Sequence, residues 1–235
     1  TARPGYYSVF LKDYGVKAEL TATDRVGFQK FTFPESDESR IIFNIGNRQG
    51  ESGPVVDAYI SMPDSNTIEG YVITEPVYVL KYQNGAVVPL YFHAVIDKTP
   101  ESVCVFHQGG EIAEGKEIKG VGSMMALNYR TKESEVINVK VGLSYTSVEN
   151  AKLNLETEAA DLNFDKALAE AEKVWEESLG RIKVYGGSED SRIKFYTGLY
   201  HAILGRGLAS DVNGAYPKND GGIGMREKGE DGRPK

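Results

Sequence analysis

The chain has 235 residues, 40% of them hydrophobic, and a formal net charge of −7. This length and composition suffice for a globular core without disulfide or metal staples. An acidic surface repels phosphate, so we expect neither nucleic acid nor an anionic membrane as a partner. The single cysteine, Cys104, has no disulfide partner within the chain. No apolar run approaches the roughly 20 residues that a membrane-spanning helix needs.

Short β-strands dominate the first 146 residues. Between residues 16 and 23, apolar and polar side chains alternate with the period of two that is typical of a half-buried strand. We predict strands at 6–11, 16–23, 28–33, 40–45, 55–61, 67–73, 77–82, 88–96, 102–107, 121–129 and 136–145. Turn-forming residues separate them, namely Asp37, 50–54, 63–66 and Asn84-Gly85, the last of which favours a type I′ hairpin. The pattern indicates an antiparallel β-sandwich.

Helical periodicity replaces this alternation after residue 146. Ser147 and Asn163 are candidate N-caps for helices over 148–159 and from 164 onward. After a short strand-like segment at 182–185, Ser188 is the candidate cap of a third helix. The apolar stripe of that helix is Ile193, Tyr196, Leu199, Tyr200 and Ile203, and Gly205 and Gly207 end it. Strands followed by helices argue against a doubly wound α/β fold.

Motifs that would carry chemistry are missing from the sequence. The three histidines are far apart, and the chain has no His-Glu-x-x-His, Cys-x-x-Cys or Gly-x-Ser-x-Gly pattern. Its fourteen tyrosines and one tryptophan are compatible with a sugar-binding platform, and equally with aromatic packing in a sheet. From the residues alone, we predict a β-sandwich that leads into helices.

Several segments, taken together, point to a known family. The runs Pro4-Gly-Tyr-Tyr-Ser-Val-Phe-Leu11 and Asp13-Tyr-Gly-Val-Lys-Ala-Glu-Leu-Thr-Ala-Thr23 closely resemble the amino-terminal domain of glycoside hydrolase family 92. Residues 141–151 are similar to the end of that domain. Phe195-Tyr-Thr-Gly-Leu-Tyr-His201 and Ser210-Asp-Val-Asn-Gly-Ala-Tyr216 are similar to the start of the catalytic domain. The resemblance covers nearly the whole chain in the same order.

The resemblance implies a mainly β fold, an antiparallel β-supersandwich followed by connector helices and the first helix of an (α/α)₆ barrel. The implied domains are a β-sandwich at 1–146, a helical connector at 147–187 and the start of the catalytic barrel at 188–235. It also implies an inverting exo-α-mannosidase, α-1,2-specific, that needs calcium. The catalytic carboxylates and the calcium ligands are expected beyond residue 235, so we assign no catalytic residue and no metal ligand within the chain.

Within the chain, the loop after the third helix is the best candidate for a substrate-binding site, because such loops build the pocket of an (α/α)₆ barrel. Asp211, Asn213 and Tyr216 are the candidate residues, either as hydrogen-bond partners of sugar hydroxyls or as supports for such partners. Alternatively, Asp211 and Asn213 shape the turn around Gly214.

The implied partners are α-mannoside glycans and the protein's own downstream catalytic domain. The implied location is the periplasm or the exterior of a bacterium, and both ends of the chain read as cut from a longer protein. The alternative is a stand-alone carbohydrate-binding β-sandwich without hydrolase activity. A free-standing module of that kind has no reason to carry the apolar third helix.

Overall fold

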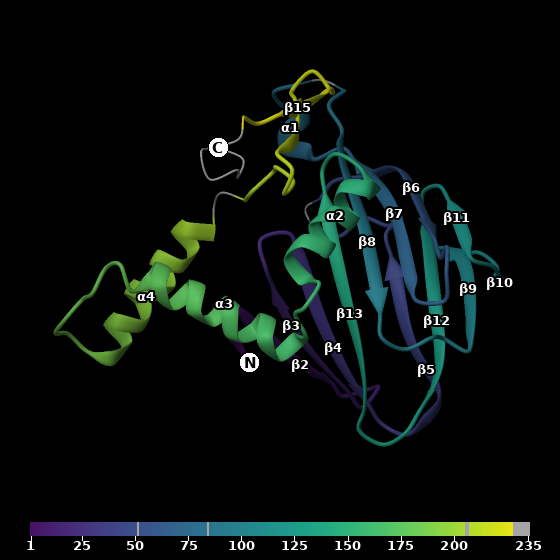
Figure 1. The fold of residues 1–235 in the computed structure, drawn as a ribbon, viewed down its shortest axis with the longest axis horizontal. Helices are drawn as coiled ribbons and strands as arrows, with labels where there is room; N and C mark the ends of the chain where they lie inside the picture. Colours follow the sequence, from purple (N-terminus) through teal and green to yellow (C-terminus); the bar gives the residue numbers. More distant parts are fainter. Residues whose placement is uncertain (51, 84, 205–206, 228–235) are drawn as a thin grey trace.

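Two antiparallel sheets pack face to face in the computed structural model, which describes residues 1–50, 52–83, 85–204 and 207–227 (Figure 1). The larger sheet has the order β1 (Ala2–Arg3), β2 (Tyr6–Leu11), β3 (Val16–Ala22), β4 (Val26–Phe33), β13 (Glu135–Ser144), β8 (Val88–Ile96), β7 (Thr67–Thr74), β6 (Val55–Ser61) and β11 (Glu117–Lys119). The smaller has the order β10 (Ala113–Glu114), β9 (Ser102–His107), β12 (Ser123–Thr131) and β5 (Ser36–Asn44). The predicted antiparallel β-sandwich is confirmed.

The core lies between the two sheets. Alternation along each strand turns one set of side chains inward, so both sheets contribute to a single apolar cluster. Its members with no more than 1% exposure include Ile60, Ile68, Ile96, Met125, Leu127 and Ile137. Burying a side chain of this size contributes about 1.5–3 kcal/mol, so this cluster is the main source of the sandwich's stability.

One predicted strand was wrong. Residues 77–82 contain helix α1 (Val77–Leu80) and a turn instead of a strand. The reason is topological, because β7 pairs directly with β8 through Thr74 opposite Val88. The segment between them is a connection, and a short helix satisfies part of its backbone locally. The predicted hairpin at Asn84-Gly85 includes Asn84, which lies outside the described residues.

One strand boundary and one further predicted strand also differ from expectation. Strand β5 begins at Ser36, in an acidic stretch in which Asp37 was predicted to form a turn. This strand lies at an edge of the smaller sheet, where charged side chains remain in water and discourage pairing with another chain. Residues 182–185 were predicted to be strand-like but form a loop, with the side chain of Tyr185 87% exposed.

The helix caps follow the sequence closely. Helix α2 (Val148–Ala159) begins after Ser147, whose Oγ accepts a hydrogen bond from Asn150 N at 3.1 Å. Helix α3 (Phe164–Leu179) begins after Asn163, whose Oδ1 accepts from Lys166 N at 2.9 Å. Helix α4 (Glu189–Leu204) begins after Ser188 in the same way. Each cap satisfies a backbone donor that the helix itself leaves free.

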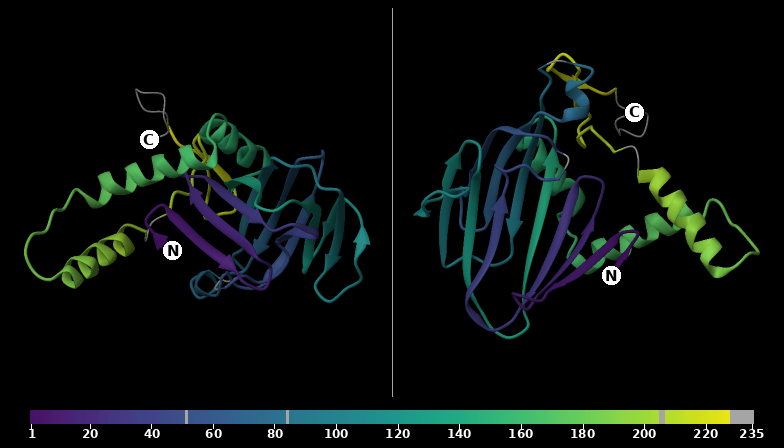
Figure 2. Two further views of the ribbon diagram at one scale, coloured as in Figure 1. Left: turned by 90° about the horizontal axis from the view of Figure 1, so that it is seen from below. Right: turned by 180° about the vertical axis from the view of Figure 1, so that it is seen from behind.

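The helices use the outer face of the larger sheet in different ways. Helix α2 lies flat on β13 and β8, and α3 contacts β2, β3 and β4 before it extends past the sandwich (Figures 1 and 2). Helix α4 contacts α3, and Trp175 and Tyr200 place their ring centroids 4.8 Å apart. No residue of α4 is buried. A hairpin of β14 (Ala215–Pro217) and β15 (Ile223–Met225) follows.

None of the helices in the described part of the chain has both the length and the apolar character that crossing a membrane requires.

Helix α2 approaches the sheet closely because β13 has a glycine at the point of contact. A Cβ atom at Gly142 would lie 2.3 Å from Ala151 O and 2.8 Å from Leu155 Cβ. Neither atom can move away without shifting the helix, so the glycine sets the distance between α2 and the sheet.

We expect Gly142→Ala to lower the free energy of unfolding by at least about 2 kcal/mol, because the added methyl group overpacks this contact. Urea denaturation measures the change. Gly198→Ala is the matched control, since a Cβ there meets nothing within 4 Å and position 198 lies inside α4. That variant should be unchanged or stabilised by up to about 1 kcal/mol. Equal stabilities for both variants would contradict the close-approach argument.

Candidate functional site: a buried junction around Asp211

Asp211 lies at the centre of a buried polar junction between the sandwich, helix α2 and the segment that follows α4. Its side chain is 2% exposed. Oδ1 accepts a hydrogen bond from Asn154 Nδ2 at 2.7 Å. Oδ2 accepts from Thr146 Oγ1 at 2.5 Å and lies 3.0 Å from Ser144 Oγ. Because a buried carboxylate is costly unless donors surround it, these bonds are what permits Asp211 to be inside the protein.

Asn154 connects all three parts of this junction. It lies within α2 and has no exposed surface. Its Nδ2 also donates to Leu143 O of β13 at 2.8 Å, and its Oδ1 accepts from Val212 N at 2.9 Å. Both amide hydrogens and the carbonyl oxygen are therefore engaged. One side chain thus binds the helix to the sheet and to the later segment.

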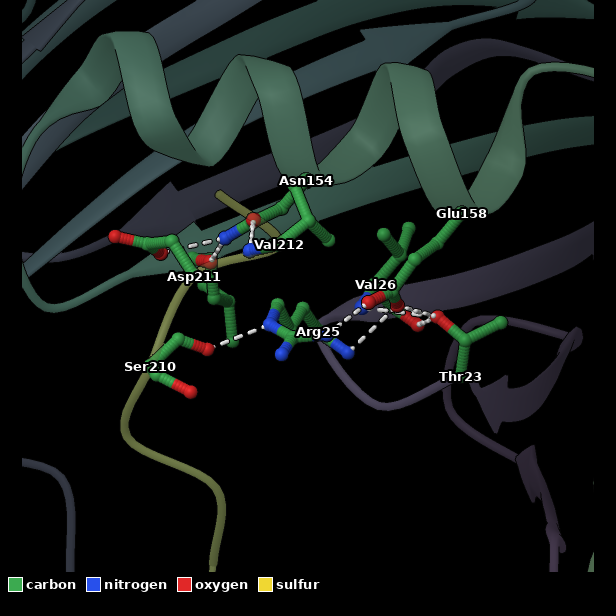
Figure 3. A network of polar contacts seen from close by, with 9 residues as sticks. Thr23, Arg25, Val26, Asn154, Glu158, Ser210, Asp211 and Val212 are labelled. Carbon is green, nitrogen blue, oxygen red and sulfur yellow. Dashed lines mark hydrogen bonds and ion pairs between the residues drawn. The ribbon is translucent and has the colours of Figure 1, made fainter. Parts of the chain in front are cut away.

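A second contact lies beside the first, and Figure 3 shows the two together. Arg25 Nη1 lies 2.5 Å from Glu158 Oε1 of α2, and Arg25 Nε donates to Ser210 O at 2.6 Å. Glu158 Oε2 also accepts from Thr23 Oγ1 at 2.6 Å and from Arg25 N at 2.9 Å. The two charged side chains are about one-seventh exposed, at 15% and 14%. A partly buried ion pair with additional hydrogen bonds is costly to break from one side.

The three predicted substrate-binding residues have different surroundings. Asp211 faces inward. Asn213 Nδ2 donates to Asn150 Oδ1 of α2 at 2.9 Å, and its Oδ1 accepts from Ala215 N at 3.0 Å. The Tyr216 ring lies over Gly224, where a Cβ would come within 2.4 Å of it, and it lines a shallow open hollow with residues 225–227. Asn213 and Tyr216 are both half-buried, and of the three only Tyr216 lines this hollow.

The turn that holds these residues has its own geometry. Gly214 N donates to Asp211 O at 2.9 Å, and Asp211 N donates to Ala215 O at 2.8 Å. Gly214 has φ +91°, which a residue with a Cβ rarely adopts. The turn-forming role considered for Asp211 and Asn213 is therefore present. Their contact with substrate stays a prediction.

The junction holds segments together and offers no reactive group. The Ser144 and Thr146 hydroxyls, the Asn154 amide and the Asp211 carboxylate are paired with one another, which leaves no nucleophile among them beside a free base. Over the described residues, no cluster of three or more His, Cys, Asp or Glu side chains has the geometry to hold a metal ion. The calcium ion that the family resemblance implies stays a prediction, with its ligands expected outside this chain.

An open groove lies beside the junction, between the first strands of the larger sheet and helices α3 and α4. Its lining combines aromatic side chains, such as Tyr6, Trp175 and Tyr196, with charged ones, such as Arg3 and Glu170. Arg3, which lines the groove, pairs with Glu172 of α3. On the α4 side, large apolar residues stay in solvent, with Ile193 57% and Leu204 51% exposed.

Our reading of the sequence assigned no role to Arg25, Glu158, Asn154, Ser144 or Thr146. A signal was present, because Asn150 and Asn154 lie one helical turn apart among Ala151 and Leu155, on the face of α2 that should be apolar. Polar residues on a buried helix face require partners. The sequence does not show which residues those partners are, since Asp211 lies 57 positions further along the chain.

Comparisons with known proteins agree with this architecture. The model of the glycosyl hydrolase family 92 N-terminal domain matches residues 1–144, and that of the family 92 catalytic domain matches residues 150–231. The sandwich and its helices thus define part of a glycoside hydrolase. The chain belongs to glycosyl hydrolase family 92.

Solved structures and a curated relative extend the comparison. A family GH92 α-mannosidase from Bacteroides thetaiotaomicron is 28% identical with a TM-score of 0.86, covering 97% of this chain and 30% of that one. A family GH92 inverting mannosidase from Bacteroides thetaiotaomicron VPI-5482 shares the fold at 21% identity and a TM-score of 0.82, covering 97% and 30%. A protein of Arthroderma benhamiae described as a secreted glycosidase is 24% identical, covering 86% of this chain and 28% of its own. The chain therefore spans less than a third of each of these proteins.

We expect Asp211→Ala to destabilise the protein by about 2–4 kcal/mol, because it leaves the Asn154 amide and two hydroxyls without their acceptor. Urea denaturation measures the loss, and amide hydrogen exchange should accelerate over residues 210–217. Asp220→Ala is the control, because Asp220 is exposed and accepts from Gly222 N in its own turn. It should change stability by no more than about 0.5 kcal/mol. Unchanged stability and exchange in Asp211→Ala would refute the junction's role.

Proposed function

We propose that the whole protein is an exo-acting α-mannosidase that releases mannose from α-mannoside glycans, with α-1,2 linkages as its preferred substrate. The observation that carries this proposal is the likeness to the family GH92 α-mannosidase at 28% identity over 97% of the chain. That likeness runs through the sandwich, the connector and the segment after α4, so it includes the junction around Asp211.

The proposed reaction inverts the configuration at the sugar. In such a reaction one carboxylic acid protonates the leaving oxygen while a carboxylate activates a water molecule on the opposite face, with the two groups roughly 6.5–9.5 Å apart. One relative of the same fold is described as an inverting mannosidase. We propose that both carboxylates, and the ligands of a calcium ion, lie in the catalytic domain beyond residue 235.

The proposed division of the chain is a sandwich at 1–146, a connector at 147–187 and the first part of an (α/α)₆ catalytic domain at 188–235. The exposure of α4 supports this division. A helix with apolar side chains and no buried residue lacks a partner surface. A stand-alone carbohydrate-binding module would leave this helix without a role, so we prefer the enzyme to the module.

Within this enzyme, we propose that Tyr216 contacts substrate and that Asp211 and Asn213 hold it in place. The side chains of Asp211 and Asn213 form hydrogen bonds with other parts of the chain, whereas Tyr216 lines an open hollow. A rigid support on α2 and β13 would limit the motion of the tyrosine ring, and substrate positioning depends on such rigidity.

We also propose that the protein works outside the cytoplasm, either in a bacterial periplasm or as a secreted enzyme. A curated relative described as a secreted glycosidase supports this location. The chain's single cysteine neither supports nor opposes it.

The test is mannose release from α-1,2-mannobiose, with and without EDTA, by a protein of the relatives' length and by residues 1–235 alone. The longer protein should release mannose, EDTA should abolish release and added calcium should restore it. Residues 1–235 should release none, because the proposed catalytic carboxylates are missing. A folded longer protein that cleaves no α-mannobiose of any linkage would overturn the proposal and favour the binding module.

A further inference from the structure

Helices cover only part of the larger sheet's outer face. The helix contacts fall on β2, β3, β4, β13 and β8, with a few at β7. In Figure 1, α2 lies in front of β13 and β8, whereas β7, β6 and β11 continue beyond it. Ala58, Ile60 and Ile68 are fully buried on the inner face. Their alternate neighbours therefore point outward, on the part of the face that lies beyond the helices.

Three tyrosines stand side by side on the outer face, two of them on β6 and β7 beyond the helices and the third on β8, which α2 also contacts. Tyr59 of β6 pairs in register with Tyr71 of β7, which pairs in register with Tyr91 of β8. Neighbouring ring centroids are 6.1 Å apart at both steps, and all three side chains are half-buried. We call Tyr59, Tyr71 and Tyr91 the tyrosine row. Cross-strand aromatic pairs stabilise a sheet, and because each tyrosine is only half-buried, part of its surface stays open to solvent, with neighbouring rings tilted by 34° and 57°.

Carboxylates border the tyrosine row and fix its rings. Tyr71 Oη donates to Asp57 Oδ2, and Tyr59 Oη donates to Glu117 Oε2, each at 2.9 Å. Burial, followed by this bond to Asp57, raises the pKa of Tyr71 above its ordinary value, so its hydroxyl remains a donor. Rings held in this way lose little conformational entropy when a ligand binds.

Other charged groups complete the border. In the next row of the sheet, Glu69 Oε2 lies 3.0 Å from His93 Nδ1. Lys119 Nζ of β11 lies 3.7 Å from Asp57 Oδ2 and is the basic side chain paired in register with Tyr59. The border of the row thus contains three carboxylates, of Asp57, Glu69 and Glu117, and the ammonium group of Lys119, which gives it an acidic character.

We propose that the tyrosine row and its bordering carboxylates bind a neutral oligosaccharide chain. Pyranose rings present C–H groups that pack on aromatic faces, and their hydroxyls donate to carboxylates. Successive rings of the row offer successive stacking positions to a chain of sugars. Single-stranded nucleic acid also stacks on aromatic rows, but it needs a basic groove, and this strip is acidic. The same argument excludes acidic polysaccharides.

This binding surface goes beyond the proposed hydrolase activity, because binding by the row needs no catalytic residue. The test of this surface therefore measures retention in a gel and not mannose release. Its result can be interpreted even if the mannosidase proposal fails.

The experiment is affinity electrophoresis through native gels that contain soluble yeast α-mannan, galactomannan or mixed-linkage β-glucan, each compared with a gel without polysaccharide. The protein should be retarded by at least one of these neutral polysaccharides and not by polygalacturonate. Tyr71→Ala should weaken retention roughly 3- to 10-fold, the amount expected for one lost aromatic contact. Tyr71→Phe keeps the ring and should retain most of the binding.

Tyr185→Ala is the matched control, because Tyr185 is 87% exposed in the loop before α4, away from the sheet. Circular dichroism verifies the fold of each variant, and Tyr59→Ala replaces Tyr71→Ala if the latter does not fold. No retardation by any neutral polysaccharide would overturn the proposal. So would retention by polygalacturonate, or a folded Tyr71→Ala variant that is retarded as strongly as Tyr185→Ala.

Discussion

The placement of everything after the sandwich depends on one buried carboxylate. Asp211 is enclosed, so its carboxyl group stays inside only while Asn154, Thr146 and Ser144 direct their polar groups at it. Ser144 lies in β13, Thr146 lies in the turn after it, and Asn154 lies in helix α2. The segment that follows α4 is therefore positioned by the sandwich itself, and a shift of any of these elements would leave a buried carboxyl group without partners.

The close approach of α2 to the sheet makes this arrangement possible. Asn154 spans from Leu143 O in β13 to Asp211 with a single short side chain, which requires the helix to lie near the strand. Gly142 supplies that proximity, because a side chain there would push against Ala151 and Leu155. The pair of Arg25 and Glu158 then fixes the far end of α2 to the turn before β4 and to Ser210. Packing and polar contacts thus depend on each other.

Local patterns in the sequence predicted most of the secondary structure. Alternation located β3, and the capping residues Ser147 and Asn163 located α2 and α3, because those features depend on neighbouring residues. The same patterns failed at residues 77–82, where apolar residues fill a connection between two paired strands. Pairing depends on residues elsewhere in the chain, and local periodicity does not report it. The family resemblance was correct because it rests on many segments in a fixed order.

The candidate site was less predictable than the fold. The loop at residues 211–216 was identified from the resemblance, but the inward orientation of Asp211 follows from donors that lie up to 67 residues earlier in the sequence. Buried polar side chains in α2 signalled that partners exist. Which groups those partners are follows only from the three-dimensional arrangement.

The bond between Asn154 and Asp211 also closes a loop of 57 residues that contains all of α3 and α4. A helix of 16 residues is about 24 Å long, so α3 rests on the sheet at one end and extends away from it toward α4. While the bond holds, the segment that contains α3 and α4 is attached to the sandwich at both ends, which restricts its motion. Once this bond and the neighbouring bonds from Arg25, Ser144, Thr146 and Asn150 open, only the base of α3 restrains both helices, so they should detach together as one cooperative unit while the sandwich stays folded.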